Sequence, residues 1–148
     1  MKKITLFSLL LLFLSALISS CAPKPDFSQN GIEIFAPSVR MVGPGAPSAI
    51  AYLQIKNASA QPDRLVSARA DFGDASLHES VLNGDVMSMD EIAGIDFPAG
   101  ALVELRSGSY HVMIINLRDG LAAGDTVHLT LEFEKAGPIN FTAKVSLP

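Results

Sequence analysis

Two histidines and two methionines in the chain carry side chains that could together hold a metal ion. Met89 follows His78 after ten intervening residues, His111 follows Met89 after twenty-one, and one residue separates His111 from Met113. Imidazole nitrogen and thioether sulfur form a soft, uncharged donor set, which suits copper best and monovalent copper most of all. Zinc fits less well, because its usual protein ligands are Cys, His and carboxylate. We therefore predict a Cu(I) site formed by His78, Met89, His111 and Met113.

The elements that position these side chains are predicted to be β-strands. Short apolar runs recur along the chain between clusters of Gly, Pro, Asn and Asp, which is typical of an all-β sandwich or barrel. The run 126–134 is the clearest, because apolar and polar residues alternate and place His128 on a face exposed to water. We expect strands at 32–36, 49–56, 64–70, 75–82, 85–95, 101–105, 110–117, 126–134 and 139–146.

A hairpin is expected to join two of the four candidate ligands. Asn83-Gly84 is a favoured pair for a two-residue type I′ turn, in which both central residues have positive φ. A turn closed there places His78 directly opposite Met89, with Cβ atoms about 5 Å apart. The same register puts Met87 on the ligand face, where we expect it to shield the metal or to pack. His111 and Met113 are two residues apart, so a strand places them on one face as well.

The N-terminal segment has the features of an export signal. Two lysines precede a long apolar run, and the stretch Ile18-Ser19-Ser20-Cys21 resembles the lipobox of bacterial lipoproteins. Cys21 is the single cysteine of the chain, which makes it a candidate for lipidation and not for an internal disulfide. We predict a lipoprotein signal peptide at 1–20, the lipidated Cys21 and a flexible tether over 21–30, and one domain at 31–148. The protein is then extracytoplasmic (periplasmic) and anchored to a membrane by lipid.

Composition and motifs argue against several classes of function. The formal net charge is −4, which disfavours nucleic acid as a partner. A blue-copper electron-transfer site needs a Cys thiolate, and the domain contains no cysteine. No hydrolase motif is present, so we do not expect an enzyme. The alternatives left open are a copper-binding lipoprotein for storage, uptake or tolerance, and a lipoprotein interaction module that binds no metal.

The ligand spacing resembles the copper site of the PCu(A)C family of periplasmic copper chaperones. The stretches Ala51–Asn57, HES…NGDVMSM and GSYHVMIINLRDGLAAGDTVHLTLEFE are also similar to that family. The resemblance implies a single cupredoxin-like Greek-key β-sandwich or barrel that binds Cu(I). It further implies delivery of copper to cytochrome oxidase assembly. The implied partners are the copper-bearing subunit of cytochrome c oxidase and Sco-like proteins.

Overall fold

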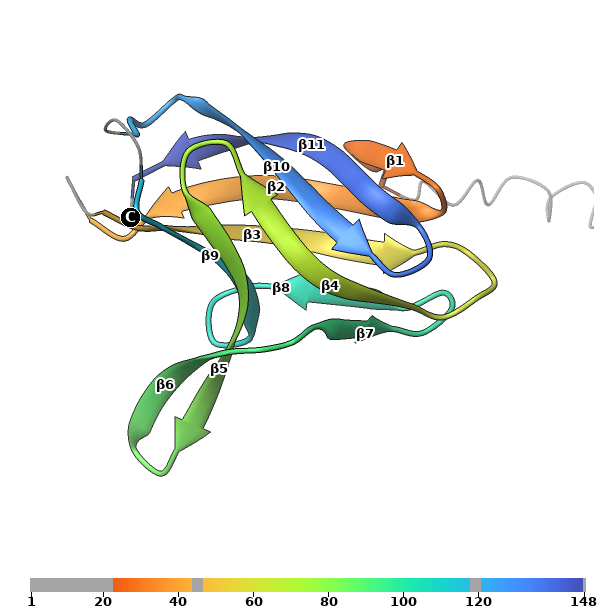
Figure 1. Ribbon diagram of the computed structural model, residues 1–148, viewed down its shortest axis with the longest axis horizontal. Coiled ribbons are helices and arrows are strands. Elements are labelled where there is room, and N and C mark those ends of the chain that lie inside the picture. The colour runs from red at the N-terminus through yellow and green to blue at the C-terminus, as the bar shows by residue number, and fades with distance from the viewer. Residues whose placement is uncertain (1–22, 44–46, 118–120, 148) are drawn as a thin grey trace, which may run out of the picture.

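The computed structural model describes residues 23–43, 47–117 and 121–147 and has an all-β architecture (Figure 1). The predicted signal segment and Cys21 lie outside these residues. None of the described elements is a helix long and apolar enough to cross a membrane. The strands are β1 (Phe27–Gln29), β2 (Ile32–Met41), β3 (Ala49–Asn57), β4 (Asp63–Ala70), β5 (Asp74–Asn83), β6 (Val86–Glu91), β7 (Ile95–Phe97), β8 (Leu102–Leu105), β9 (Tyr110–Ile115), β10 (Thr126–Phe133) and β11 (Gly137–Ser146).

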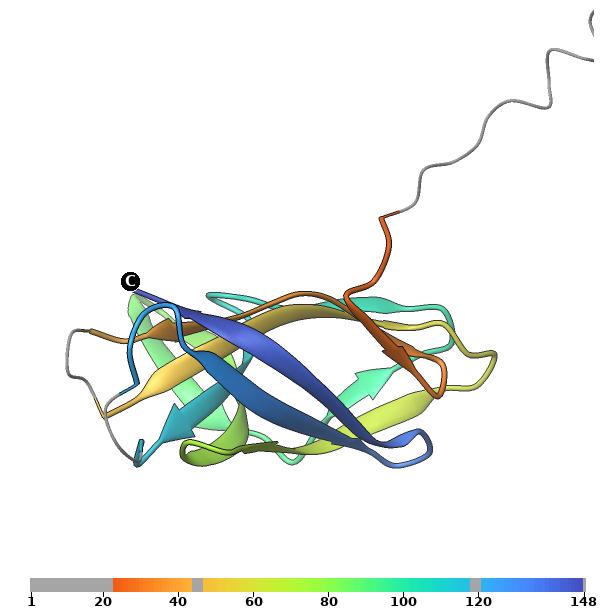
Figure 2. The same ribbon diagram turned by 90° about the horizontal axis from the view of Figure 1, so that it is seen from above.

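The strands form one hydrogen-bonded ladder that wraps around a central interior (Figure 2). Buried apolar side chains from most of these strands form the core. The order is β6-β5-β9-β3-β2-β11-β10-β4-β7, with β1 added to β2 and β8 added to β3. Strands β11 and β2 pair in parallel, and the other pairs within the described residues are antiparallel. The β5–β6 hairpin stands at one end of this order and extends away from the rest of the molecule (Figure 1).

The alternation expected for the run 126–134 is present in β10. Val127, Leu129, Leu131 and Phe133 are buried, whereas His128 between them is exposed. Because successive side chains of a strand point to opposite faces, each strand of this kind gives one face to the interior. The prediction of an all-β single domain is therefore confirmed, and most strands fall close to the predicted ranges. β2 is an exception, because it continues to Met41 beyond the predicted end at residue 36.

One predicted strand, 85–95, is in fact two. β6 ends at Glu91, and β7 begins at Ile95 and pairs with β4. Gly94, between them, has a φ of +156°, and a Cβ placed on it would lie 2.6 Å from the carbonyl oxygen of Leu65. The backbone approaches β4 so closely here that only glycine fits without a shift. The chain therefore leaves the projecting hairpin at Gly94 and returns to the sandwich.

The start of the domain also differs from the prediction, which assigned 21–30 to a flexible tether. Residues Phe27–Gln29 form β1 and pair with β2. The joining residues Asn30 and Gly31 have φ values of +51° and +82°, as a type I′ hairpin turn requires. The ring of Phe27 lies 5.8 Å from that of Phe141, measured between centroids. This part of the expected tether therefore belongs to the folded domain.

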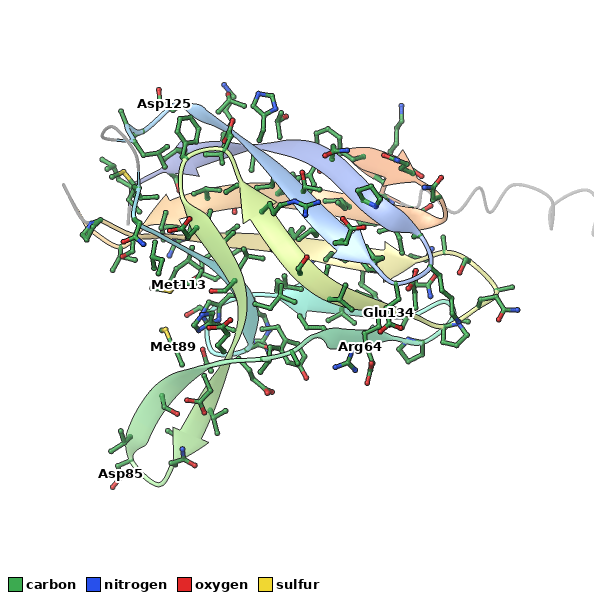
Figure 3. All side chains as sticks on the ribbon, viewed as in Figure 1. Arg64, Asp85, Met89, Met113, Asp125 and Glu134 are labelled. Carbon is green, nitrogen blue, oxygen red and sulfur yellow. The ribbon has the colours of Figure 1, made fainter. Side chains whose placement is uncertain are left out.

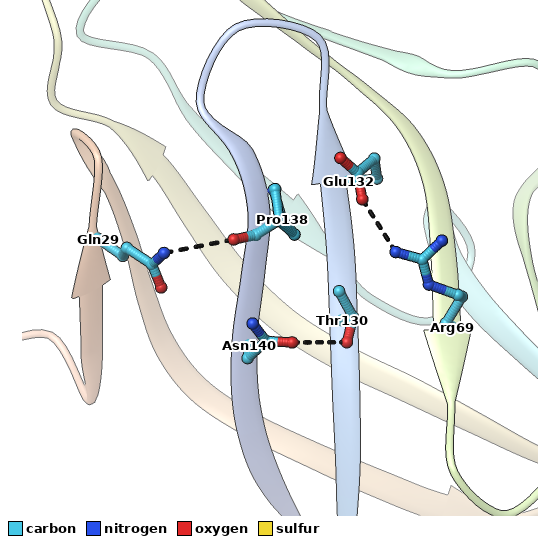
Figure 4. Close-up of polar contacts among 6 residues, drawn as sticks. All are labelled: Gln29, Arg69, Thr130, Glu132, Pro138 and Asn140. Carbon is cyan, nitrogen blue, oxygen red and sulfur yellow. Dashed lines mark hydrogen bonds and ion pairs between the residues drawn. The ribbon is translucent and has the colours of Figure 1, made fainter.

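Polar side-chain contacts join β1, β11, β10 and β4 in turn (Figure 4). The amide of Gln29 donates to the carbonyl of Pro138 on β11 at 3.4 Å. The hydroxyl of Thr130 on β10 donates to the side-chain oxygen of Asn140 on β11 at 2.8 Å. Arg69 on β4 is paired with Glu132 on β10 at 3.0 Å. These groups are largely exposed to water, so each contributes at most about 1 kcal/mol.

A buried asparagine connects the far end of β3 to the loops around it. Asn57 is fully buried, and its side-chain nitrogen donates to the carbonyl oxygens of Gln61 and Phe97 at 2.7 and 3.0 Å. Its side-chain oxygen accepts from the backbone nitrogen and the hydroxyl of Ser59 at 3.0 and 2.7 Å. One side chain therefore satisfies four polar groups of the neighbouring loops, of which the carbonyl of Phe97 is in a buried contact.

Candidate metal centre

The four predicted ligands lie on three adjacent strands. His78 is on β5, Met89 is on β6, and His111 and Met113 are on β9. β5 is paired with β6 on one side and with β9 on the other. The expectation that the strand containing His111 passes beside the hairpin is therefore met.

The predicted register of the hairpin is wrong by two residues. The turn residues are Gly84 and Asp85, Asn83 pairs with Val86, and His78 lies opposite Glu91 and not Met89. Gly84 has a φ of +64°, whereas Asp85 is not among the residues with positive φ. In a type II′ turn, only the first of the two central residues has positive φ, and that residue is usually glycine. The hairpin turn fits this type. The hairpin thus uses the glycine of the Asn-Gly pair and excludes the asparagine from the turn.

The shift changes the partners but not the faces, because side chains alternate with a period of two. Met89 is opposite Ser80, diagonally next to His78 and on the same face. On the other side, His78 pairs directly with His111, and Met113 pairs with Ser76. The four predicted ligands therefore share one face of the β6-β5-β9 sheet. Figure 3 shows Met89 and Met113 on the same side of the molecule, where the hairpin leaves the sandwich.

The two imidazole rings are close enough to share one ion. Their centroids lie 5.7 Å apart, and their planes are inclined by 32°. Metal–nitrogen bonds are about 2 Å long, so two imidazoles on one ion have centroids roughly 5 to 6.5 Å apart. Within the described part of the chain, Nδ1 of His78 and Nε2 of His111 are the two buried side-chain polar atoms without a hydrogen-bond partner. Such atoms are rare in native proteins, and a missing ion is one explanation.

The other nitrogen of each ring is hydrogen-bonded. Nδ1 of His111 lies 3.0 Å from the carbonyl oxygen of Ser109, and Nε2 of His78 lies 2.9 Å from the hydroxyl of Ser76. A carbonyl can only accept, so Nδ1 of His111 carries the proton and Nε2 presents a lone pair. A hydrogen bond to the ring nitrogen that does not bind the metal is the usual arrangement of a ligating histidine.

Burial differs sharply between the two halves of the site. His111 is 2% exposed although it lies on the face opposite the core residues Val112 and Ile114. Met89 is 52% exposed and Met87 is 55% exposed. Met87 is opposite Leu82, two pairs nearer the hairpin tip than the Ser80–Met89 pair, and not opposite Ser80 as predicted. A bound ion would therefore have its most buried side at His111 and its most open side at Met89, since His78 and Met113 are of intermediate burial.

The surroundings of the site are acidic. No Lys or Arg occurs between Arg69 and Arg106, and the hairpin itself contains Glu79, Asp85, Asp90 and Glu91. A concentration of carboxylates attracts cations and repels anions over about a Debye length. The field around the candidate ligands thus favours a cationic metal or a basic partner.

Sequence reasoning did not identify two residues of this face. Glu91 is opposite His78 because of the shifted register, which the Asn-Gly signal could not give. Ser76 precedes His78 by two residues, a spacing that places both on one face of a strand and could have been noticed. In the described residues, no group of three His, Cys, Asp or Glu side chains is arranged to hold a metal ion.

Comparison with known proteins identifies the family. The family model described as "Putative lipoprotein LpqE-like" matches residues 32–145, which is most of the chain. This chain belongs to the LpqE-like family. A protein named "Putative lipoprotein Lxx21020" from Leifsonia xyli subsp. xyli (strain CTCB07) is 26% identical to it over 133 residues, covering 88% of this chain and 76% of that protein.

Solved structures similar to this LpqE-like chain are PCuAC domains and a related copper protein. The copper-bound PCuAC domain from PmoF2 is 27% identical with a TM-score of 0.69, covering 82% of this chain and 97% of that domain. The solution structure of Cu(I)-DR1885 from Deinococcus radiodurans is 25% identical with a TM-score of 0.62, covering 86% and 81% of the two chains. The predictions of a PCu(A)C-type family and of a cupredoxin-like fold are confirmed.

Proposed function

We propose that this protein binds one Cu(I) ion through His78, Met89, His111 and Met113 and acts as a non-catalytic copper carrier. The observation that supports it most is the pair of facing imidazoles, each with a buried ring nitrogen that has no hydrogen-bond partner. Two neutral nitrogens and two thioether sulfurs favour monovalent copper over harder divalent ions. The similarity to domains solved with copper bound supports the same proposal.

The exposure of Met89 supports a role in transfer. A carrier must release its ion to another protein, and ligand exchange requires that an incoming donor reach the metal. Met89 is half exposed on a hairpin that projects from the sandwich, so an acceptor can approach from this side (Figure 3). His111 lies on the buried side and would keep its place during the exchange.

A titration under reducing conditions tests the binding. We expect one Cu(I) ion per chain, with a dissociation constant far below about 1 µM, in competition with a Cu(I) chelator. The soft and uncharged donor set is the reason. An affinity weaker than micromolar would contradict the proposal and would favour an interaction module without metal.

We further propose that lipid on Cys21 anchors the protein outside the cytoplasm and that copper is delivered there to cytochrome oxidase assembly. The lipoprotein descriptions of the family and of the relative from Leifsonia support the anchor. Delivery to the copper-bearing oxidase subunit or to Sco-like proteins rests on the resemblance of the ligand spacing.

Replacement of Cys21 by Ser tests the anchor and the delivery in one strain. The variant cannot be acylated, so we expect it to leave the membrane fraction and to appear in the soluble extracytoplasmic fraction. Delivery at the membrane predicts a lower copper content of the oxidase in that strain. A variant that stays in the membrane fraction would contradict the anchor, and unchanged oxidase copper would contradict delivery at the membrane.

A further inference from the structure

The two candidate imidazoles differ in which ring nitrogen is hydrogen-bonded and which is left without a partner. His111 has its partnerless nitrogen at Nε2, and His78 has it at Nδ1. The tautomer of His111 is fixed by the carbonyl of Ser109, which also accepts from the backbone nitrogen of Ser80 at 3.1 Å and so is held by the sheet itself. The tautomer of His78 depends on a side chain, because its bonded nitrogen faces the hydroxyl of Ser76.

A hydroxyl can donate or accept, so two arrangements are open for His78. If Ser76 donates to Nε2, the proton of His78 sits on Nδ1, buried and without an acceptor. If Ser76 accepts from Nε2, Nδ1 presents a lone pair on the same face as the lone pair of His111. Only the second arrangement leaves a lone pair on the partnerless nitrogen of each ring, where a cation could accept both.

We propose that Ser76 is a positioning residue that holds His78 in its Nε2–H tautomer. One copper ion is then bound by Nδ1 of His78 and by Nε2 of His111. This inference rests on the proposed copper site but concerns a residue outside the ligand set. The place of Ser76 in the sheet suits the role, since it precedes His78 on the same face of β5 and lies opposite Met113. Partners of this kind typically change metal affinity by about 10- to 100-fold.

The chain offers a matched control for this residue. Ser80 follows His78 by two residues, as Ser76 precedes it, and also lies on the ligand face, opposite Met89. The hydrogen bond of His78 goes to Ser76. Replacement of either serine by alanine removes one hydroxyl from the same strand and face, and only Ser76→Ala removes the partner of the imidazole.

The test is a long-range ¹H–¹⁵N correlation spectrum of the histidine rings in the metal-free protein at about pH 8.5, where imidazole is normally neutral. We expect Nε2–H for His78 and Nδ1–H for His111. Ser76→Ala should convert His78 to a mixture of tautomers and lower Cu(I) affinity by about 10-fold. Ser76→Thr should restore both, and Ser80→Ala should change neither.

A metal-free wild-type protein with His78 in the Nδ1–H form would overturn the inference, and so would Ser76→Ala with unchanged tautomer and affinity. The wild-type spectrum decides the tautomer even if a variant does not fold. Because this spectrum needs no metal, failure of the protein to bind copper would refute the proposed function and leave the tautomer of His78 still measurable. On addition of Cu(I), the ¹⁵N signals of Nδ1 in His78 and Nε2 in His111 should shift most.

Discussion

We expect replacement of His111 by Leu to lower the affinity for Cu(I) by more than about 100-fold, since it would remove a proposed ligand and not merely a partner of one. The same change should leave the metal-free protein at least as stable as the parent. His111 buries a nitrogen without a partner, and such a group costs about 1–3 kcal/mol that an apolar side chain of similar size would not. Chelator competition gives the affinity, and urea unfolding of the metal-free protein gives the stability.

The third histidine provides the control for this prediction. His128 is exposed on β10, away from the three strands that contain the site. His128→Leu should keep the affinity of the parent and should retain the rise in melting temperature that bound copper gives. If His111→Leu binds copper as tightly as the parent, or if His128→Leu loses binding, the site has been assigned to the wrong residues.

Replacement of Asn57 by Ala should lower the stability of the protein and leave its copper affinity unchanged, which is the reverse of the effects expected for His111→Leu. It leaves the buried carbonyl of Phe97 and the partly buried backbone nitrogen of Ser59 without their partner. We expect the free energy of unfolding to fall by about 3–5 kcal/mol. Copper affinity of the folded fraction should stay unchanged, because Asn57 ends β3 far along the strand from the residues paired with β9.

Asn140 is the matched control for this second prediction, since it is an asparagine in a strand with a side-chain hydrogen bond, but at the surface. Asn140→Ala should change stability by no more than about 0.5 kcal/mol. Urea unfolding of both variants measures the difference. Equal effects of the two substitutions would show that burial of the Asn57 network does not matter to stability.

Strand positions could be predicted from the sequence because the alternation of apolar residues depends on local geometry. β10 is the clearest case, with its four buried residues at every second position. The break between β6 and β7 could not be predicted in this way. At the break, Gly94 comes close to the carbonyl of Leu65, a residue nearly thirty positions earlier in the chain. A contact between residues so far apart in sequence cannot be predicted from the local pattern of apolar residues.

The two Asn-Gly pairs of the chain show how far turn signals can be used. Asn30-Gly31 forms the type I′ turn that the pair favours, and it joins β1 to β2 where a flexible tether was predicted. Asn83-Gly84 does not form that turn, because Asn83 pairs with Val86 and leaves Gly84 and Asp85 in the loop. The dipeptide therefore predicts a hairpin more reliably than it predicts the register.

The prediction that the candidate ligands share one face was nevertheless correct, because a register error of two residues leaves every side chain on its own face. Met89 remained beside His78 for this reason. The direct pairing of His78 with His111 could not be predicted from sequence, since it depends on which strand lies next to β5 in the folded sheet. The orientation of each imidazole could not be predicted from the sequence either, because it depends on hydrogen bonds to Ser76 and Ser109 in the folded sheet.

X-ray absorption at the copper edge of the Cu(I)-loaded protein measures the donor atoms directly. Coordination by both imidazoles and both thioethers predicts about two nitrogen and two sulfur neighbours for each copper ion, with the sulfur contribution reduced in Met89→Ala. A spectrum with nitrogen and oxygen neighbours alone, and no sulfur at bonding distance, would contradict a site formed by His78, Met89, His111 and Met113.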